Sequence, residues 1–250
     1  MFIKLIMKEW KEKEFMNRNR RAAAFGLAAV LTVSGTQLPG AVVKAADETG
    51  AVPTAPIVIT EVVPNTDNLS GSDAWEYYEI ANVSDKDVKL SDYNIVYDNG
   101  SAKKVWTATG VDVLPAGKTM LVWVRNGCND EKGIAKFREY YQTKTGKTIP
   151  EDGLIAEVRC GGLANTDSRS MYIVTKTGKT LSTITYKAAD SAKGKLDVDE
   201  AIIFRHSGDT GTPVYDQTPS PLALSDGNFS GTYALPTAVE APTVEVAGPS

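Results

Sequence analysis

Carboxylates are the side chains of this 250-residue sequence that most readily suggest chemistry. Glu61, Glu76 and Glu79 lie in neighbouring segments of strand-like composition. Two carboxylates facing one substrate can hydrolyse a glycosidic bond, one as the acid and the other as the base or nucleophile. The same spacing fits an outward strand face or hydrogen-bonded structural acids, and we favour this structural interpretation. A carboxylate-dependent hydrolase is kept as the alternative function.

Other catalytic signatures fail on spacing. His206 is the only histidine, so a nucleophile–histidine arrangement would have to use it, and we expect it to be a polar loop residue after a strand. The Gly-Lys-Thr triplets at Gly117, Gly146 and Gly178 lack the earlier glycine of a phosphate loop. No Gly-x-Ser-x-Gly elbow is present. We therefore predict no catalytic residue, no cofactor and no enzymatic activity.

Two acidic segments concentrate oxygen ligands that could bind calcium. Residues 65–68 lie near Asp73 in the sequence, and residues 197–200 read Asp-Val-Asp-Glu. Neither fits the twelve-residue calcium loop, which needs alternating ligands, a central glycine and a terminal glutamate. One histidine and two distant cysteines likewise supply no zinc cluster. We predict no metal site and solvated acidic loops, with weak calcium binding left open.

Four aromatic residues could together form a platform for a sugar ring: Trp75, Tyr77, Trp106 and Trp123. Buried aromatics are the commoner explanation in a β-rich domain. Trp123 lies inside an apolar run and is predicted to be core. Trp75, beside Asp73 and Glu76, is the best candidate for partial exposure.

The elements that must position these residues are short strands separated by turn signals. The predicted strands cover residues 57–63, 77–83, 93–97, 103–107, 120–124, 171–175, 181–186 and 201–204. Asn99-Gly100 predicts a tight hairpin, and the apolar run at 120–124 predicts a strand buried on both faces. Residues 133–142 alone have helical spacing, with Asn129 or Asp130 available as N-cap and Gly146 as terminator. We predict an all-β sandwich with one short helical insertion.

The N-terminal residues have the pattern of an export signal. A cationic segment at 16–21 precedes an uncharged apolar stretch at 22–33, and small residues at Val43-Lys44-Ala45 predict cleavage before Ala46. We assign residues 1–45 to a signal peptide, with Met16 as a possible true start. The apolar stretch is too short for a spanning helix, so no transmembrane segment is expected after signal removal. The predicted location is secreted or associated with the cell envelope.

Linkers flank the predicted domain of residues 57–230. Residues 46–56 and 231–250 are rich in Pro and Ala, and we expect the second linker to lead into a further domain. The net charge is −4, and residues 1–45 carry eight basic and three acidic residues, so the rest has a net charge of −9. This acidity disfavours nucleic acid as a partner, because such binding depends on neutralising phosphates.

The two cysteines could form a disulfide. Export favours oxidation, the count is even, and Cys128 and Cys160 bracket the predicted helix. We predict a Cys128–Cys160 disulfide, which would add roughly 3–4 kcal/mol of stability in the chain-entropy model. Two free thiols are the alternative.

Several ordered motifs resemble the lamin-tail domain family, in its bacterial exported form. They are residues 57–65 (IVITEVVPN), 76–82 (EYYEIAN), 88–95 (VKLSDYNI), 114–123 (LPAGKTMLVW) and 171–181 (MYIVTKTGKTL), with 137–141 and 161–165 similar to the family's helical insertion. The resemblance covers about residues 57–225. It implies an immunoglobulin-like sandwich and a non-catalytic module, in bacteria often joined to secreted phosphoesterase or nuclease domains.

The leading hypothesis is therefore a binding or adaptor module of an exported multidomain protein, which positions a hydrolase partner domain. A secreted hydrolase and a passive cell-envelope spacer are the alternatives. The ligand is unknown, and a glycan, a protein or a cell-envelope component would each fit.

Overall fold

The computed structural model describes residues 51–224, 227–230 and 236. The chain divides into two units, Met1–Ala45 and Ala46–Ser250, and all described residues belong to the second. The predicted signal peptide, the start of the linker at 46–56 and almost all of the linker at 231–250 lie outside the described residues. Those assignments stay predictions.

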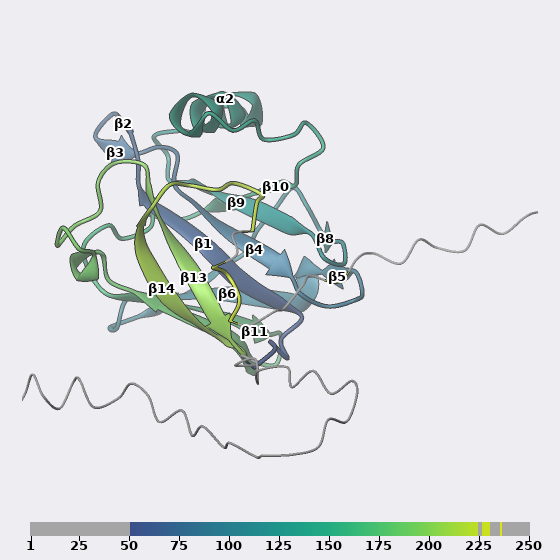
Figure 1. Cartoon of the computed structure of the whole chain (residues 1–250). Coiled ribbons are helices and arrows are strands. Elements are labelled where there is room, and N and C mark those ends of the chain that lie inside the picture. Colours follow the sequence, from purple (N-terminus) through teal and green to yellow (C-terminus); the bar gives the residue numbers. More distant parts are fainter. Residues whose placement is uncertain (1–50, 225–226, 231–235, 237–250) are drawn as a thin grey trace, which may run out of the picture. The chain divides into compact units, whose positions relative to one another are not determined.

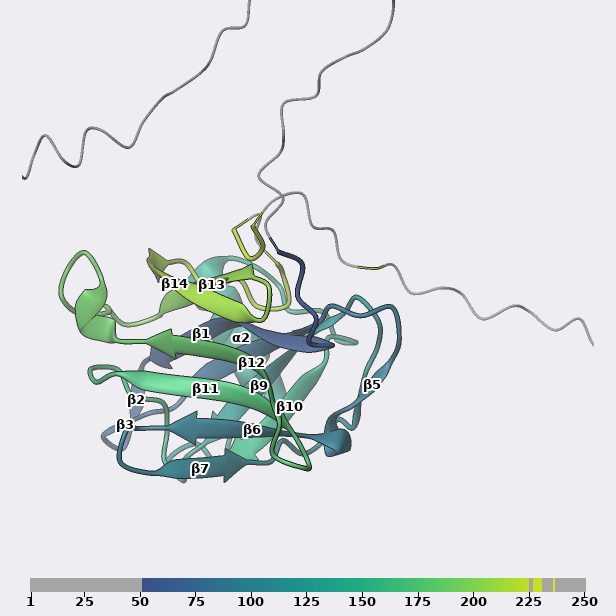
Figure 2. The same cartoon turned by 90° about the horizontal axis from the view of Figure 1, so that it is seen from below.

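Ten strands form one sheet that folds over on itself into two layers (Figures 1 and 2). The first layer contains β1 (Ile57–Asn65), β4 (Tyr77–Asn82), β9 (Thr119–Arg125), β10 (Ile155–Arg159) and β13 (Glu200–Ser207). The second contains β6 (Tyr93–Asp98), β7 (Lys103–Trp106), β11 (Arg169–Thr175) and β12 (Thr180–Tyr186). β14 (Thr210–Gln217) pairs with β13 and β12 and so joins the layers. The predicted all-β, immunoglobulin-like sandwich is confirmed.

Short elements fill the connections between the main strands. They are β2 (Asn68–Leu69) with β3 (Ser72–Asp73), β5 (Val88–Lys89) with β8 (Val113–Leu114), and the 3-10 turns η1 (Leu90–Asp92) and η2 (Ala188–Asp190). The predicted Asn-Gly hairpin joins β6 to β7, where Gly100 has a φ of 84° that few other residues tolerate.

The helix α2 (Ile134–Thr145), the one α-helix among the described residues, lies over the outer face of the first layer (Figure 1). It ends at Gly146 as predicted, with that residue in the left-handed region. The predicted N-cap is wrong, because Gly133 occupies the cap position. Asn129 is instead buried, and its side-chain amide donates to the carbonyls of Ala74 and Val124 at 2.6 and 2.8 Å.

The apolar core has two main parts, one on each side of the first layer. β9 shows the division, because Met120, Val122 and Val124 pack between the two layers while Leu121 and Trp123 pack under α2. Phe137 and Tyr141 of α2 complete the second part. β9 is therefore buried on both faces, as the continuous apolar run at residues 120–124 predicted.

Two strands of the ten-stranded sheet were absent from the sequence prediction. β14 contains Gly211 and Pro213, which normally argue against a strand. It tolerates Pro213 because its pairing with β12 is limited to Thr210 and Gly211. Gly211 is required, since a Cβ there would lie 2.8 Å from Ile184 Cγ2 and 3.0 Å from the His206 ring. The second, β10, is a short strand that pairs in parallel with β9.

Candidate ligand pocket

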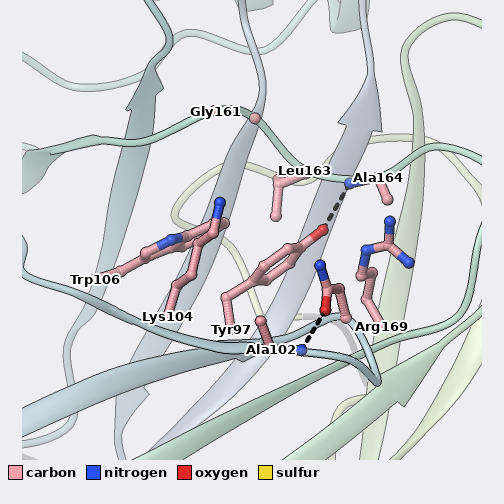
Figure 3. Close-up of a pocket in the computed structure, with 10 residues that line it drawn as sticks. Tyr97, Ala102, Lys104, Trp106, Gly161, Leu163, Ala164 and Arg169 are labelled. Atoms are coloured by element: carbon pink, nitrogen blue, oxygen red, sulfur yellow. Dashed lines mark hydrogen bonds between the residues drawn. The ribbon is translucent and has the colours of Figure 1, made fainter.

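A cavity of about 250 Å³ opens between the β6–β7 hairpin and the loop that follows β10 (Figure 3). Its lining residues are Tyr97, Asn99, Ala102, Lys104, Trp106, Gly161, Gly162, Leu163, Ala164 and Arg169. The hairpin, the loop and the first residue of β11 thus each contribute one wall. Because loops carried on a rigid sandwich commonly form binding sites, we take this cavity as the candidate site.

Two stacked aromatic rings form the apolar wall of the pocket. The Tyr97 and Trp106 rings are 4.2 Å apart and nearly parallel, and the Tyr78 ring lies 6.2 Å from Trp106 on the interior side. Tyr97 also ties the hairpin to the loop, because its hydroxyl accepts the backbone N–H of Ala164 at 2.8 Å (Figure 3). These rings shape the pocket but are too covered by protein to stack on a ligand.

Hydrogen-bond donors form the polar part of the pocket. Figure 3 shows Lys104 and Arg169 on either side of the Tyr97 ring. Lys104 has no ion-pair partner within the part of the chain that the structure describes. Arg169 is oriented by the carbonyl of Ser168 at 2.7 Å and the carboxylate of Asp167 at 3.3 Å. No carboxylate lines the pocket.

Asn99 adds a neutral donor at the tip of the hairpin. Its side-chain oxygen accepts the backbone N–H groups of Ser101 and Ala102 at 3.1 and 2.8 Å. These two hydrogen bonds hold the Asn99 amide oxygen in the turn, so its amide nitrogen remains available as a donor.

Glu76 lies behind the loop wall of the pocket. One of its oxygens accepts the backbone N–H of Leu163 at 2.9 Å, and the other lies 3.0 Å from the position a Cβ on Gly162 would take. Burial, with a smaller effect from Asp73, raises the pKa of Glu76 to about 9. The carboxyl is therefore protonated at neutral pH and supports the loop as an uncharged group.

The three glutamates singled out in the sequence are all buried, so none is placed as a hydrolytic acid or base. Glu61 accepts the backbone N–H and hydroxyl of Ser220, both at 2.9 Å, and the Tyr77 hydroxyl at 3.1 Å. Glu79 accepts the Thr60 hydroxyl and the backbone N–H of Leu222, both at 2.7 Å. Both carboxyls thus hold residues 218–224, which we call the C-terminal strap, against the first layer.

Glu61 and Glu79 are also direct cross-strand neighbours on β1 and β4. Burial raises the pKa of both, to about 7 for Glu61, and the like charge of Glu61 further raises that of Glu79. The pair is a structural anchor, in agreement with the interpretation favoured from the sequence.

His206 is not in a loop, which corrects the sequence interpretation. It lies within β13, is fully buried, and its Nε2 is 2.7 Å from the carbonyl oxygen of Ile59 on β1. Burial lowers the pKa of its imidazole. The neutral ring links two strands and reaches no pocket.

The structure brings the two acidic segments together around a lysine. Lys144 of α2 lies 2.8 Å from carboxylate oxygens of both Asp67 and Asp199. Asp197 pairs with Lys193 at 2.7 Å. The described residues contain no group of three or more His, Cys, Asp or Glu side chains that could hold a metal ion.

The expected exposure of Trp75 is wrong. Trp75 is only 8% exposed, and its ring is stacked between the rings of Tyr140 and Trp123, with centroid distances of 4.6 and 5.9 Å. Tyr77, Trp106 and Trp123 are buried as well. These four residues therefore form no sugar platform on the surface.

The predicted disulfide is absent, because Cys128 and Cys160 are both free thiols. The Cys128 thiol donates to the side-chain oxygen of Asn126 at 2.9 Å and packs beside the core under α2. Cys160 packs against the core between the two layers, and burial raises its pKa to about 11. The two side chains therefore face different parts of the core, although the strands that precede them, β9 and β10, are adjacent.

Sequence reasoning missed the donors of the pocket. Lys104 and Arg169 lie 65 positions apart in the sequence, and no motif marks either of them. The Asn99-Gly100 turn and the Gly161-Gly162 pair were the available signals, and each indicates only a turn or loop. Only the fold brings them together.

The fold defines an immunoglobulin-like β-sandwich module. Residues 51–188 match the model of the Lamin Tail Domain, and the chain belongs to this family of non-enzymatic, immunoglobulin-like domains. It is also 33% identical over 137 residues to the uncharacterized protein YvnB of Bacillus subtilis (strain 168). That alignment covers 52% of this chain and 10% of the relative. Among the described residues, no helix is long and apolar enough to cross a membrane.

Proposed function

We propose that this domain is a recognition module of an exported protein and that it binds its ligand in the pocket between the β6–β7 hairpin and the 161–164 loop. One observation carries the proposal: three side chains with donor groups, Asn99, Lys104 and Arg169, converge on a cavity that no part of the described chain fills. Asn99 and Lys104 are exposed and Arg169 is half-buried, so all three side chains can donate hydrogen bonds to a ligand in the cavity.

The module is proposed to act as an adaptor that positions a hydrolase domain, a phosphoesterase or nuclease, near a ligand outside the cell. The YvnB relative supports a multidomain setting, because the shared region is only a tenth of that protein. The basic and apolar pattern of residues 16–33 supports export. The ligand is accordingly sought among glycans, proteins and other components of the cell envelope.

The test is a binding screen of the purified protein against these three classes, paired with a variant that fills the pocket. Gly161 suits this purpose, because a Cβ there meets no atom within 4 Å and the backbone is not in the left-handed region. Gly161→Phe is expected to abolish binding of the ligand found in the screen while the protein stays folded.

Gly133→Phe is the matched control, since Gly133 is equally open, caps the helix and lies outside the pocket. Its ligand binding is expected to equal that of the wild type. Unchanged binding by Gly161→Phe would refute the assignment of the pocket, whichever ligand the screen identifies.

A further inference from the structure

We infer that the pocket recognises its ligand through an oxyanion, a carboxylate, phosphate or sulfate group that the ligand presents at its end. This inference rests on the proposed function, because it names the chemistry of the ligand that the same pocket would bind.

The charge of the lining is the first support. Lys104 and Arg169 place two cations on a wall that includes no carboxylate. Of the two, only Arg169 has a carboxylate neighbour, and Asp167 is itself largely exposed to solvent at 73%. Lys104 is thus free to pair with a ligand, and an Arg guanidinium matches the geometry of carboxylate and phosphate oxygens.

The donor inventory is the second support. Lysine, arginine and the available amide nitrogen of Asn99 are all donors, so the polar lining offers hydrogen atoms and few acceptors. A neutral sugar hydroxyl both donates and accepts, whereas an oxyanion only accepts. The lining therefore fits an oxyanion better than a neutral polyol.

The apolar wall and the size of the pocket limit the rest of the ligand. The Trp106 ring is covered by Tyr97 on one side and approached by Tyr78 on the interior side, so it offers no open face for stacking. A cavity of about 250 Å³ is smaller than those that enclose a drug-sized molecule. It would hold one charged group and the first few atoms attached to it, with the remainder of the ligand outside.

Glu76, the acid directly behind the loop wall, adds no negative charge to the pocket at neutral pH. Its carboxyl lies directly behind Gly162, where an ionised group would oppose an anion in the pocket. Burial keeps that carboxyl protonated at neutral pH, so the wall behind the loop carries no charge. The site is thus a local cationic pocket within a domain that is acidic as a whole.

The experiment measures binding of three oxyanion probes, glucuronate, glycerol phosphate and inorganic sulfate, with glucose and glycerol as neutral counterparts. Lys104→Gln and Arg169→Gln are each expected to weaken binding of the charged probes about tenfold, the effect of losing one charge-assisted hydrogen bond. Lys89→Gln is the matched control, because it removes the same charge from an exposed lysine of β5 outside the pocket. Glucose and glycerol are expected not to bind, and the ranking of the three probes identifies the type of oxyanion.

Arg169→Lys separates charge from structure. It keeps the cation and is expected to recover most of the affinity that Arg169→Gln loses, whereas a purely structural role would leave both variants impaired. Absence of binding by all three probes, or equal losses in Lys89→Gln and Lys104→Gln, would overturn the inference.

The two proposals fail in different ways. If Gly161→Phe blocks a screened ligand that Lys104→Gln and Arg169→Gln bind normally, the pocket is the recognition site but the oxyanion inference is wrong. If the probes bind as expected while Gly161→Phe leaves the screened ligand bound, the anion site is real and the proposed recognition function lies elsewhere on the domain.

Discussion

The buried pair Glu61 and Glu79 should make the stability of this domain fall as the pH rises. The pKa of Glu61 is about 7 in the folded domain, against an ordinary value of 4.5. Below pH 4.5, Glu61 is protonated in both the folded and the unfolded state, so the anchor contributes fully to the free energy of unfolding. At a pH between the two pKa values, Glu61 has lost its proton in the unfolded chain and still holds it in the folded domain. The unfolded state then binds fewer protons, so the free energy of unfolding decreases with pH.

The size of this effect follows from the two pKa values. They differ by ~2.5 pH units, each of which corresponds to about 1.4 kcal/mol, so Glu61 accounts for a loss of about 3 kcal/mol as the pH rises to its folded pKa. Glu61→Gln keeps the shape of the side chain and an acceptor oxygen for the strap, but it cannot ionise. The variant should therefore show a flatter dependence of unfolding free energy on pH, by up to this amount. The contribution of Glu76 to the slope remains in both proteins, and that of Glu79 becomes smaller in the variant, because the like charge of Glu61 that raises its pKa is gone.

Urea denaturation followed by tryptophan fluorescence, from mildly acidic to mildly alkaline pH, measures the two curves. Glu131→Gln serves as the control, because it changes an exposed glutamate in the same way and should leave the wild-type slope intact. Parallel curves for the wild type and Glu61→Gln would refute the reasoning, since they would mean that burial does not raise the pKa of Glu61 in the folded domain.

Three further predictions follow from the site and the sequence. Lys144→Met should lower the free energy of unfolding by about 1 kcal/mol, because two partly exposed ion pairs are lost, and unchanged urea midpoints would contradict this. Phosphoesterase, nuclease and glycosidase substrates should not be turned over, with or without divalent metal, and turnover that disappears in a folded Glu79→Gln variant would show an enzyme. Protein recovered from the culture medium should begin at Ala46 by N-terminal sequencing, and retention of the full chain inside cells would contradict the export proposal.

Much of the fold could be predicted from the sequence because its signals are local. The segment at residues 77–83 and the continuous apolar run of β9 each indicate a strand from local residues alone, and both strands are buried on both faces. β14 escaped prediction because tertiary context, not propensity, makes a strand of a segment that contains Gly211 and Pro213.

The candidate site was less predictable, for a different physical reason. A buried acid such as Glu76 and an exposed one look identical in sequence, since what separates them is the loop that closes over it. The pocket cations come from two strands of the second layer and meet a loop from between β10 and β11. Such a convergence has no sequence period, so composition and spacing alone could not reveal it.

The C-terminal strap determines which residues must be included when this module is transferred to another protein. The region matched by the family model ends at residue 188, before β13, β14 and the strap. A fragment trimmed at that point would lose the β13 edge that pairs with β1 and would leave Glu61 and Glu79 without the Ser220 and Leu222 donors. The portable unit, for fusion or for recombination in evolution, therefore extends well beyond the residues that the family model matches.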